Sequence, residues 1–149
     1  MENLHQQTIP EIFKARAVHY GSKACVAYKD QKEGRYRDIS WADMDAKVSA
    51  LARYLLSRGV KKGDRVAVFS ANRPEWWMAD LAILSVGAVN VPVYATNSAE
   101  EARYILDHSD SRLCFAGDSE QAQNVLSLLQ ALPDLEERVI FDDPEGKDG

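Results

Sequence analysis

Apolar and polar positions along this chain follow two different periods, and the change of period divides it into segments. Between residues 40 and 59 apolar residues recur every three or four positions, which is typical of one face of a helix. From residue 64 on, short continuous apolar runs alternate with helical patterns of about 10–14 residues. Because a continuous apolar run is expected of a strand covered on both faces, this alternation predicts a mostly parallel sheet with right-handed crossovers.

The pattern predicts five helices and six strands. In chain order they are a helix Thr8–Tyr20, strands Ala24–Tyr28 and Tyr36–Ile39, a helix from Ser40 that stops before Gly59, a strand Val66–Phe69, a helix Pro74–Val86, a strand Val89–Tyr94, a helix Ala99–His108, a strand Leu113–Ala116, a helix Ser119–Leu132 and a strand Val139–Phe141. The first two strands are joined by a polar turn ending in glycine, which predicts an antiparallel hairpin. Pro92 lies inside an expected strand, where it removes one ladder donor.

Capping residues stand at most of the expected helix starts. The sequences Thr8-x-x-Glu11 and Ser98-x-x-Glu101 are capping boxes, and Ser40 is expected to cap with Asp43 as the reciprocal partner. Asn72 is expected to cap a helix whose first residue is Pro74. In the helix after Ser40, one apolar face is expected, made of Met44, Val48, Leu51, Leu55 and Leu56.

Glycines are expected to end three of the helices. Gly21, Gly59 and Gly87 each follow a helical pattern directly, and glycine adopts the left-handed conformation that closes a helix at its C-terminal end.

The fold class that follows is α/β, a mostly parallel sheet with flanking helices, preceded by a helix and an antiparallel hairpin. We expect residues 1–39 to form that helix and hairpin, with the hairpin belonging to another sheet. We expect residues 40–141 to form the α/β subdomain and residues 142–149 to form a flexible tail.

Composition narrows the function classes. The 149 residues suit one domain or part of a larger one, and the net charge of −5 with interspersed signs disfavours a nucleic-acid binder. The densest basic cluster is Lys61, Lys62 and Arg65, which we interpret as solvated turn charges, with a phosphate contact as the alternative. Cys25 and Cys114 lie in unrelated apolar segments, so two buried free thiols are favoured over a disulfide or zinc site.

Targeting signals are absent from the pattern. The first ten residues lack the apolar core of a signal peptide. The longest apolar stretch, from Trp76 to Val93, is interrupted by Asp80 and Asn90, so a buried helix followed by a buried strand is favoured over a membrane span. We therefore expect a cytoplasmic protein without a transmembrane segment, and leave peripheral attachment to a membrane open.

Five short motifs occur in a fixed order between Ile39 and Phe141. They are the helix end Leu51–Leu56 followed by Gly59-Val60-x-x-Gly63-Asp64-Arg65-Val66-Ala67, then Asn72-x-Pro74-Glu75, then Gly87-Ala88-Val89 leading to Val91-Pro92-Val93-Tyr94, then Ala95-Thr96-Asn97-Ser98, and Glu100 with Tyr104-Ile105-Leu106. In this order the motifs resemble the N-terminal region of AMP-forming acyl-CoA synthetases, within the adenylate-forming superfamily. The stretch VPVYATNSAEE resembles the long-chain fatty acid branch.

Each matched residue also has a structural explanation. Gly59 and Gly63 permit unusual backbone angles, Asp64 can accept from its own turn backbone, and Pro74 presets a helix start. The spacing Gly59-x-x-x-Gly63 is not a phosphate loop, because it follows a helix and opens a strand. The motifs are therefore interpreted as marks of a scaffold.

The resemblance implies a two-step reaction for the intact enzyme. A fatty acid and ATP, assisted by Mg²⁺, form an acyl-adenylate and pyrophosphate, and the thiol of CoA then displaces AMP. The family's lysine-containing phosphate loop, its later acidic motif and its C-terminal catalytic lysine match no position of this sequence. We therefore expect no catalytic, cofactor-binding or metal residue here, no ATP, Mg²⁺ or CoA bound by this chain alone, and no independent activity.

Two other interpretations of the chain stay open. One is a stand-alone α/β interaction or small-ligand-binding module on the synthetase scaffold, and the other is a deliberate or proteolytic fragment of a longer enzyme. The partners implied for the intact enzyme are fatty acid, ATP, CoA and the remaining domains of the same protein, with a homodimer as an open alternative.

Two loops follow strands at the edge of the sheet where ligands usually bind. For Ser70–Asn72 helix capping is favoured, with a ligand contact as the alternative, and Tyr94–Asn97 has the same placement. Trp76 and Trp77 lie about 100° apart on a helix, so we expect one in the core and the other facing a second domain, a subunit or solvent.

The remaining chemical residue types favour ordinary roles. Asp107–Asp110 contains triad-like types, but adjacent residues rarely form a triad, so a helix end with His108 near its C-terminus is favoured. His5 and His19 have no partner cluster for a metal. The pairs Glu100-Glu101 and Glu136-Glu137 are expected to be solvated.

Overall fold

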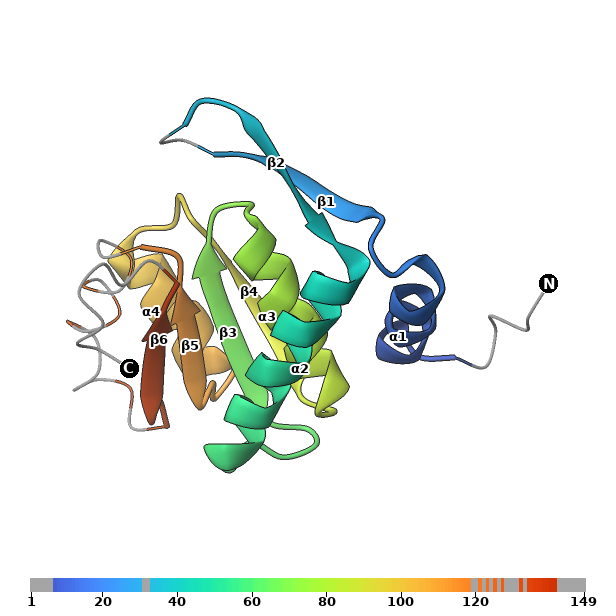
Figure 1. Cartoon of the computed structure of the whole chain (residues 1–149). Coiled ribbons are helices and arrows are strands. Elements are labelled where there is room, and N and C mark those ends of the chain that lie inside the picture. The colour runs from blue at the N-terminus through green and yellow to red at the C-terminus, as the bar shows by residue number, and fades with distance from the viewer. Residues whose placement is uncertain are drawn as a thin grey trace.

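A four-stranded parallel sheet with helices on both faces forms the centre of the molecule, and a separate antiparallel hairpin lies above it (Figure 1). The computed structural model describes residues 7–30, 33–118, 121, 123, 125, 127, 132 and 134–141. The elements are α1 (Ile9–Tyr20), β1 (Ala24–Lys29), β2 (Tyr36–Ser40), α2 (Trp41–Ser57), β3 (Arg65–Ser70), α3 (Pro74–Ser85), β4 (Val89–Tyr94), α4 (Ala99–His108), β5 (Leu113–Ala116) and β6 (Glu137–Ile140). The predicted α/β class is confirmed.

Strand β3 is the centre of the sheet, whose order is β4-β3-β5-β6 with parallel pairing throughout. Val66 to Phe69 are at most 1% exposed, as the continuous apolar run predicts. Val66 and Val68 face the core beneath α2 and α3, whereas Ala67 and Phe69 face the core beneath α4. The period of two along one strand therefore builds both cores.

Pro92 is tolerated because β4 is an edge strand of the described sheet. The Val89 N–H donates to the Asp64 carbonyl at 2.8 Å, so alternate residues from Val89 on direct their backbone groups toward β3. Pro92 belongs to the residues in between, whose backbone groups point away from β3. Its missing N–H would therefore face the open edge of the described sheet. The ladder to β3 therefore loses no hydrogen bond.

The hairpin of β1 and β2 pairs antiparallel, as predicted, and forms its own two-stranded sheet. One side packs on the core through Cys25, Val26 and Ile39. Helix α1 packs beside α2, where the Phe13 and Tyr20 rings lie 5.8 and 5.6 Å from that of Trp41. The division into residues 1–39 and 40–141 stays a prediction.

The strongest local signals are confirmed. Both capping boxes are present, at Thr8 and at Ser98. The three predicted helix-ending glycines all have positive φ, 53° at Gly21 and 76° at Gly59 and Gly87. Helix α2 ends in the left-handed turn that Gly59 predicts. The N–H groups of Gly59 and Val60 donate to carbonyls in the last turn of the helix.

Two predictions for α2 are wrong. The Asp43 carboxylate does not reach the Ser40 backbone and instead accepts from the Ser40 hydroxyl at 2.6 Å, because aspartate is one methylene shorter than glutamate. Leu56 is 57% exposed, whereas Leu55 is fully buried. One residue further along a helix turns the side chain by about 100°, which takes Leu56 off the buried face.

Other predictions fall partly outside the described residues. Within the predicted helix Ser119–Leu132, the described residues 121, 123, 125 and 127 are helical, and the others up to residue 131 lie outside the described residues, as does the tail 142–149. The last strand starts earlier than predicted and ends at Ile140. Among described residues, no helix is long and apolar enough to cross a membrane.

The neighbouring leucines of α2 provide a matched pair for testing which face is buried. Leu55→Ala should lower the free energy of unfolding by about 3–5 kcal/mol, because it leaves a cavity in the core. Leu56→Ala should change it by about 0.5 kcal/mol or less. Chemical denaturation of both variants measures this, and equal losses would place both side chains in the core.

Candidate functional site

The sheet has its topological switch point between the carboxyl ends of β3 and β5. From β3 the chain passes through α3 to β4, at one edge of the sheet. From β5 it passes to β6, at the opposite edge. Helix α3 packs on the core that contains Val66, while Val125, after β5, packs on the opposite one. Such a reversal of strand order is where open α/β sheets bind ligands.

Three residues pack together at this switch point. The Gly117 N–H donates to the Phe69 carbonyl at 2.9 Å and to Gln121 Oε1 at 3.0 Å. A Cβ atom at Gly117 would lie 2.5 Å from Ser70 Oγ and 2.6 Å from Gln121 Oε1, so any larger residue would force these side chains to shift. Ser70 and Gln121 are 6% and 7% exposed, which makes this a close-packed polar joint between the two strands.

Arg73 joins the two strand ends at the switch point. Its Nη1 donates to the Gly117 carbonyl at 2.8 Å, and its Nε pairs with Glu75 at 2.8 Å. The guanidinium also lies over the Phe141 ring, 5.8 Å from its centroid. This cation therefore fixes the end of β5 against the start of α3.

The prediction that Asn72 caps α3 is wrong. Arg73 occupies the cap position, and no side chain accepts a hydrogen bond from the first turn. The helix starts at Pro74, which has no N–H to satisfy, so the demand for a cap is smaller. Asn72 is exposed in the loop between β3 and α3. A ligand contact by Ser70–Asn72 stays a prediction.

The loop Tyr94–Asn97 lies at the carboxyl end of β4, as expected. Its turn is closed by the Asn97 N–H, which donates to the Tyr94 carbonyl at 2.9 Å. Tyr94 is 79% exposed, and a hollow beyond the loop is lined by Asn97, Ser98, Glu100, Glu101, Tyr104 and Ile105. The hollow carries hydroxyl, amide and carboxylate groups but no cation.

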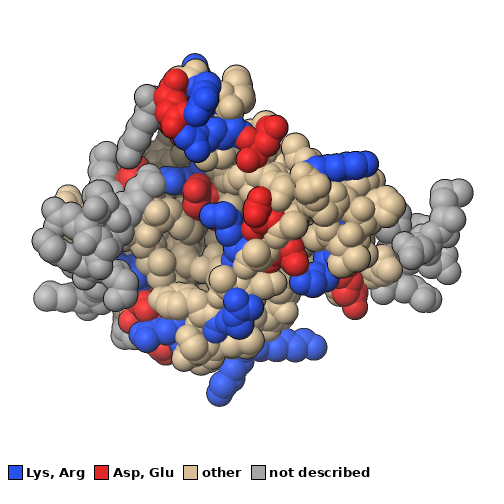
Figure 2. All heavy atoms as spheres, viewed as in Figure 1, with Lys and Arg blue, Asp and Glu red and all other residues tan. Residues whose placement is uncertain are grey.

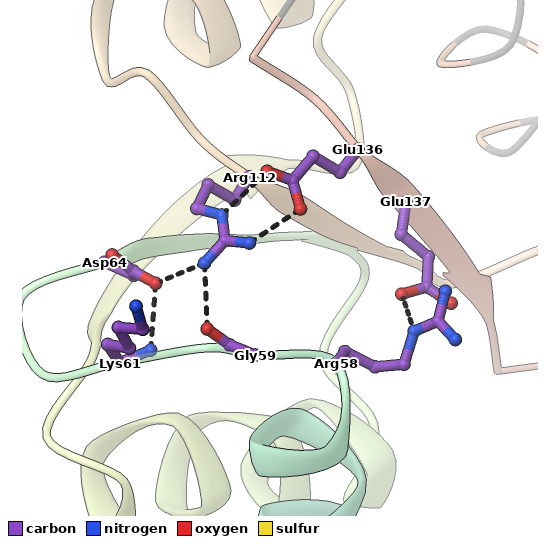
Figure 3. A network of polar contacts seen from close by, with 7 residues as sticks. All are labelled: Arg58, Gly59, Lys61, Asp64, Arg112, Glu136 and Glu137. Carbon is purple, nitrogen blue, oxygen red and sulfur yellow. Dashed lines mark hydrogen bonds and ion pairs between the residues drawn. The ribbon is translucent and has the colours of Figure 1, made fainter.

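The opposite edge of the sheet is held by ion pairs that the sequence motifs did not reveal (Figure 3). Arg112 Nη1 contacts Asp64 at 2.6 Å and the Gly59 carbonyl at 3.0 Å, while Nη2 contacts Glu136 at 2.6 Å. Asp64 also accepts from the Lys61 N–H at 2.8 Å, which confirms its predicted turn bond. Glu136 is therefore ion-paired, not simply solvated.

Glu137 forms a second arm of this network. It accepts from Arg58 at 2.6 Å and from the Tyr54 hydroxyl at 2.7 Å, and so joins α2 to β6 (Figure 3). Burial and this carboxylate raise the pKa of Tyr54 to about 12. Asp64 and the Gly59 carbonyl, both in the matched family motif, are thus part of the network at the amino edge of the sheet.

In the basic cluster of the turn, Arg65 is ion-paired, whereas Lys61 and Lys62 form no ion pair with the described residues. Arg65 pairs with Asp110 at 3.1 Å and donates to the Ser109 carbonyl at 2.6 Å. Lys61 and Lys62 are exposed. The alternative of a phosphate contact here stays untested.

The remaining candidates largely follow the ordinary interpretations. Trp76 packs against the core and Trp77 is 56% exposed, as expected of adjacent positions. His108 stacks on Tyr104 near the end of α4, 5.6 Å between centroids, and forms no triad. No group of metal-ligating residues occurs among the described residues, and His5 lies outside them.

Both cysteines are free, as predicted, but only Cys114 is fully buried. Burial raises the pKa of its thiol to about 12. Cys25 is half-buried because it lies on the hairpin, which has the core on one side only.

Three comparisons with known proteins agree with one another. Residues 13–149 match the family model described as AMP-binding enzyme. The chain is 42% identical over 112 residues to the long-chain-fatty-acid–CoA ligase FadD15 of Mycobacterium bovis, covering 75% of this chain and 19% of the relative. It is 30% identical over 131 residues to the long-chain-fatty-acid–CoA ligase heimdall of Drosophila melanogaster, covering 87% and 19%.

Solved structures show the same fold. A putative long-chain-fatty-acid CoA ligase from Rhodopseudomonas palustris aligns with a TM-score of 0.79 at 26% identity, over 94% of this chain and 34% of that one. The N-terminal domain of FACL13 from Mycobacterium tuberculosis aligns with a TM-score of 0.77 at 24% identity, over 91% and 33%. The chain thus spans about a fifth of the length of the curated relatives it matches.

Gly117→Ala should lower the free energy of unfolding by about 1–3 kcal/mol, because the new methyl group overlaps Ser70 and Gln121. Ser70→Gly removes the nearer obstruction, so the double variant should be more stable than the sum of the two single changes by about 1 kcal/mol. Denaturation of the four proteins measures the coupling. Strict additivity would contradict the close packing at this joint.

The Arg112 network predicts that the stability of the fold depends on pH. Hydrogen bonds from the Lys61 backbone and from Arg112 lower the pKa of Asp64, and Arg112 lowers the pKa of Glu136. A lowered folded-state pKa adds stability above the unfolded-state value, which is lost as pH falls through the folded-state value. Arg112→Gln should therefore lower the free energy of unfolding by about 1 kcal/mol at pH ~7 and by less at pH ~3.

Arg53→Gln is the matched control, because Arg53 makes no ion pair within the described part of the chain. Its stability curve should run parallel to that of the unchanged protein between the two pH values. If Arg112→Gln also gave a parallel curve, the ion pairs would carry no pH-dependent stability.

Proposed function

Because the chain belongs to the AMP-binding enzyme family, we propose that it is the N-terminal part of a long-chain fatty acid–CoA ligase. The observation that carries this proposal is the 42% identity to a ligase of that kind over three quarters of the chain. In the proposed reaction, ATP and a fatty acid form an acyl-adenylate and pyrophosphate with the help of Mg²⁺. The thiol of CoA then displaces AMP.

The chain's own part in that enzyme is to provide a rigid α/β subdomain. Among the residues that match the family motifs, Gly59 and Asp64 bind Arg112 at the amino edge of the sheet, whereas Glu75 pairs with Arg73 at the carboxyl edge. The groups at the switch point between β3 and β5, Ser70, Gln121 and Arg73, donate and accept hydrogen bonds. They support binding and positioning, and they include no paired nucleophile and base.

Contacts with the rest of the enzyme are proposed at the exposed aromatic residues near the β4 edge. Trp77 on α3 and Tyr94 at the end of β4 are 56% and 79% exposed, and large aromatic side chains bury well in interfaces. The remaining domains of the same protein are the proposed partner, and a second subunit is the alternative. We also propose a cytoplasmic location with peripheral attachment to membranes.

The extent of the coding sequence tests the proposal directly. A reading frame that continues for several hundred residues past Gly149 and encodes a lysine-containing Ser/Thr/Gly-rich phosphate loop would support it. A stop codon directly after Gly149 would contradict it and favour a stand-alone binding module on the same scaffold.

The 149-residue chain by itself should not catalyse the reaction. Incubated with ATP, Mg²⁺, CoA and a long-chain fatty acid, it should release neither pyrophosphate nor AMP in an acid-dependent manner, because it has no residues that match the family's phosphate loop and catalytic lysine. Coupled pyrophosphate detection measures this. Release that scales with the concentration of the chain would overturn the assignment of a scaffold role.

A further inference from the structure

Two neighbouring turns form one surface at the amino edge of the sheet. The Gly63 N–H, in the turn after α2, donates to the Gly87 carbonyl in the turn after α3, at 2.9 Å. The Lys62 stem crosses this junction, since its Cγ lies 3.2 Å from where a Cβ of Gly87 would stand. We call this surface the basic platform; it consists of residues 53–63 and 85–89.

The charge of this region is opposite to that of the protein as a whole. Residues 46–63 contain Lys47, Arg53, Arg58, Lys61 and Lys62 but no aspartate or glutamate, and residues 81–89 contain no charged residue, whereas the chain carries −5. Figure 2 shows Lys and Arg side chains projecting from the end of the molecule below α2. The platform therefore attracts anions although the protein as a whole repels them.

Most of these cations are free to bind something else. Arg58 is held by Glu137 at 2.6 Å. Arg53, Lys61 and Lys62 make no ion pair within the part of the chain that the structure describes. Their charges are consequently not neutralised by the described carboxylates.

Apolar side chains are exposed beside the same cations. Leu56, in the last turn of α2, is 57% exposed, and Val89, at the start of β4, is 48% exposed. An exposed leucine among lysines and arginines fits the boundary of a bilayer, where cations meet headgroup phosphates and an apolar side chain enters the acyl region. An acidic protein or a nucleic acid would match the charge but leave Leu56 without a role.

We propose that the basic platform docks on an anionic phospholipid surface. This deepens the peripheral attachment proposed above and does not depend on the ligase chemistry. Strands β3 and β4 both begin at the platform, so docking places the carboxyl ends of β3 and β5 at the end of the sheet that faces away from the bilayer (Figure 1). Binding is weak and salt-sensitive, since each cation near an anionic leaflet strengthens it about five-fold.

Sedimentation of the 149-residue chain with vesicles tests the proposal, using phosphatidylcholine with and without phosphatidylserine. Binding should require phosphatidylserine and fall when ionic strength is raised from about 0.1 M to about 1 M. Lys61→Gln/Lys62→Gln should weaken it about 25-fold. Leu56→Ser should weaken it about five-fold without changing the net charge.

The matched control is Lys23→Gln/Lys29→Gln, which removes two exposed cations from the opposite end of the molecule. It should bind vesicles nearly as well as the unchanged chain, and thermal unfolding should show that all variants fold. Equal losses in both double variants, no binding by the unchanged chain, or tighter binding to poly-glutamate or heparin than to vesicles would each overturn the proposal. Since no nucleotide or acyl substrate is present, these outcomes are independent of the test for ligase activity.

Discussion

The burial of β3 on both faces is the constraint on which the rest of the structure depends. Its two side-chain sets belong to different cores, one beneath α2 and α3 and the other beneath α4. Its two backbone edges pair with β4 and β5. A strand in this position cannot shift its register by one residue without exchanging both cores at once, so every other element takes its place from β3.

The two ends of the sheet consequently serve different purposes. At the amino edge, Arg112 gathers the starts of β3, β5 and β6 through Asp64, Glu136 and a backbone carbonyl. At the carboxyl edge, the strand order reverses at a switch point where Gly117 packs closely against Ser70 and Gln121. The amino edge is therefore held by ion pairs, whereas the carboxyl edge is the one at which open α/β sheets usually bind ligands.

Local sequence signals predicted most of the elements correctly, because each depends on residues a few positions apart. Capping boxes such as Thr8 with Glu11 place their partners within one turn, and glycine at positive φ ends a helix whatever surrounds it. The signals failed where the outcome depended on fine geometry. Asp43 was too short for a reciprocal cap, Asn72 stood one residue too early, and Leu56 was turned away from the core.

The sequence by itself determined the α/β class, the parallel sheet and the family, since periodicity and motif order are properties of the chain alone. Only the tertiary structure decided the strand order, the edge position that makes Pro92 harmless, and the contacts of Arg112 with Asp64 and of Arg73 with Gly117. These partners stand more than 40 positions apart in the sequence. No local pattern relates such residues, because their meeting depends on how the crossovers order the strands around β3.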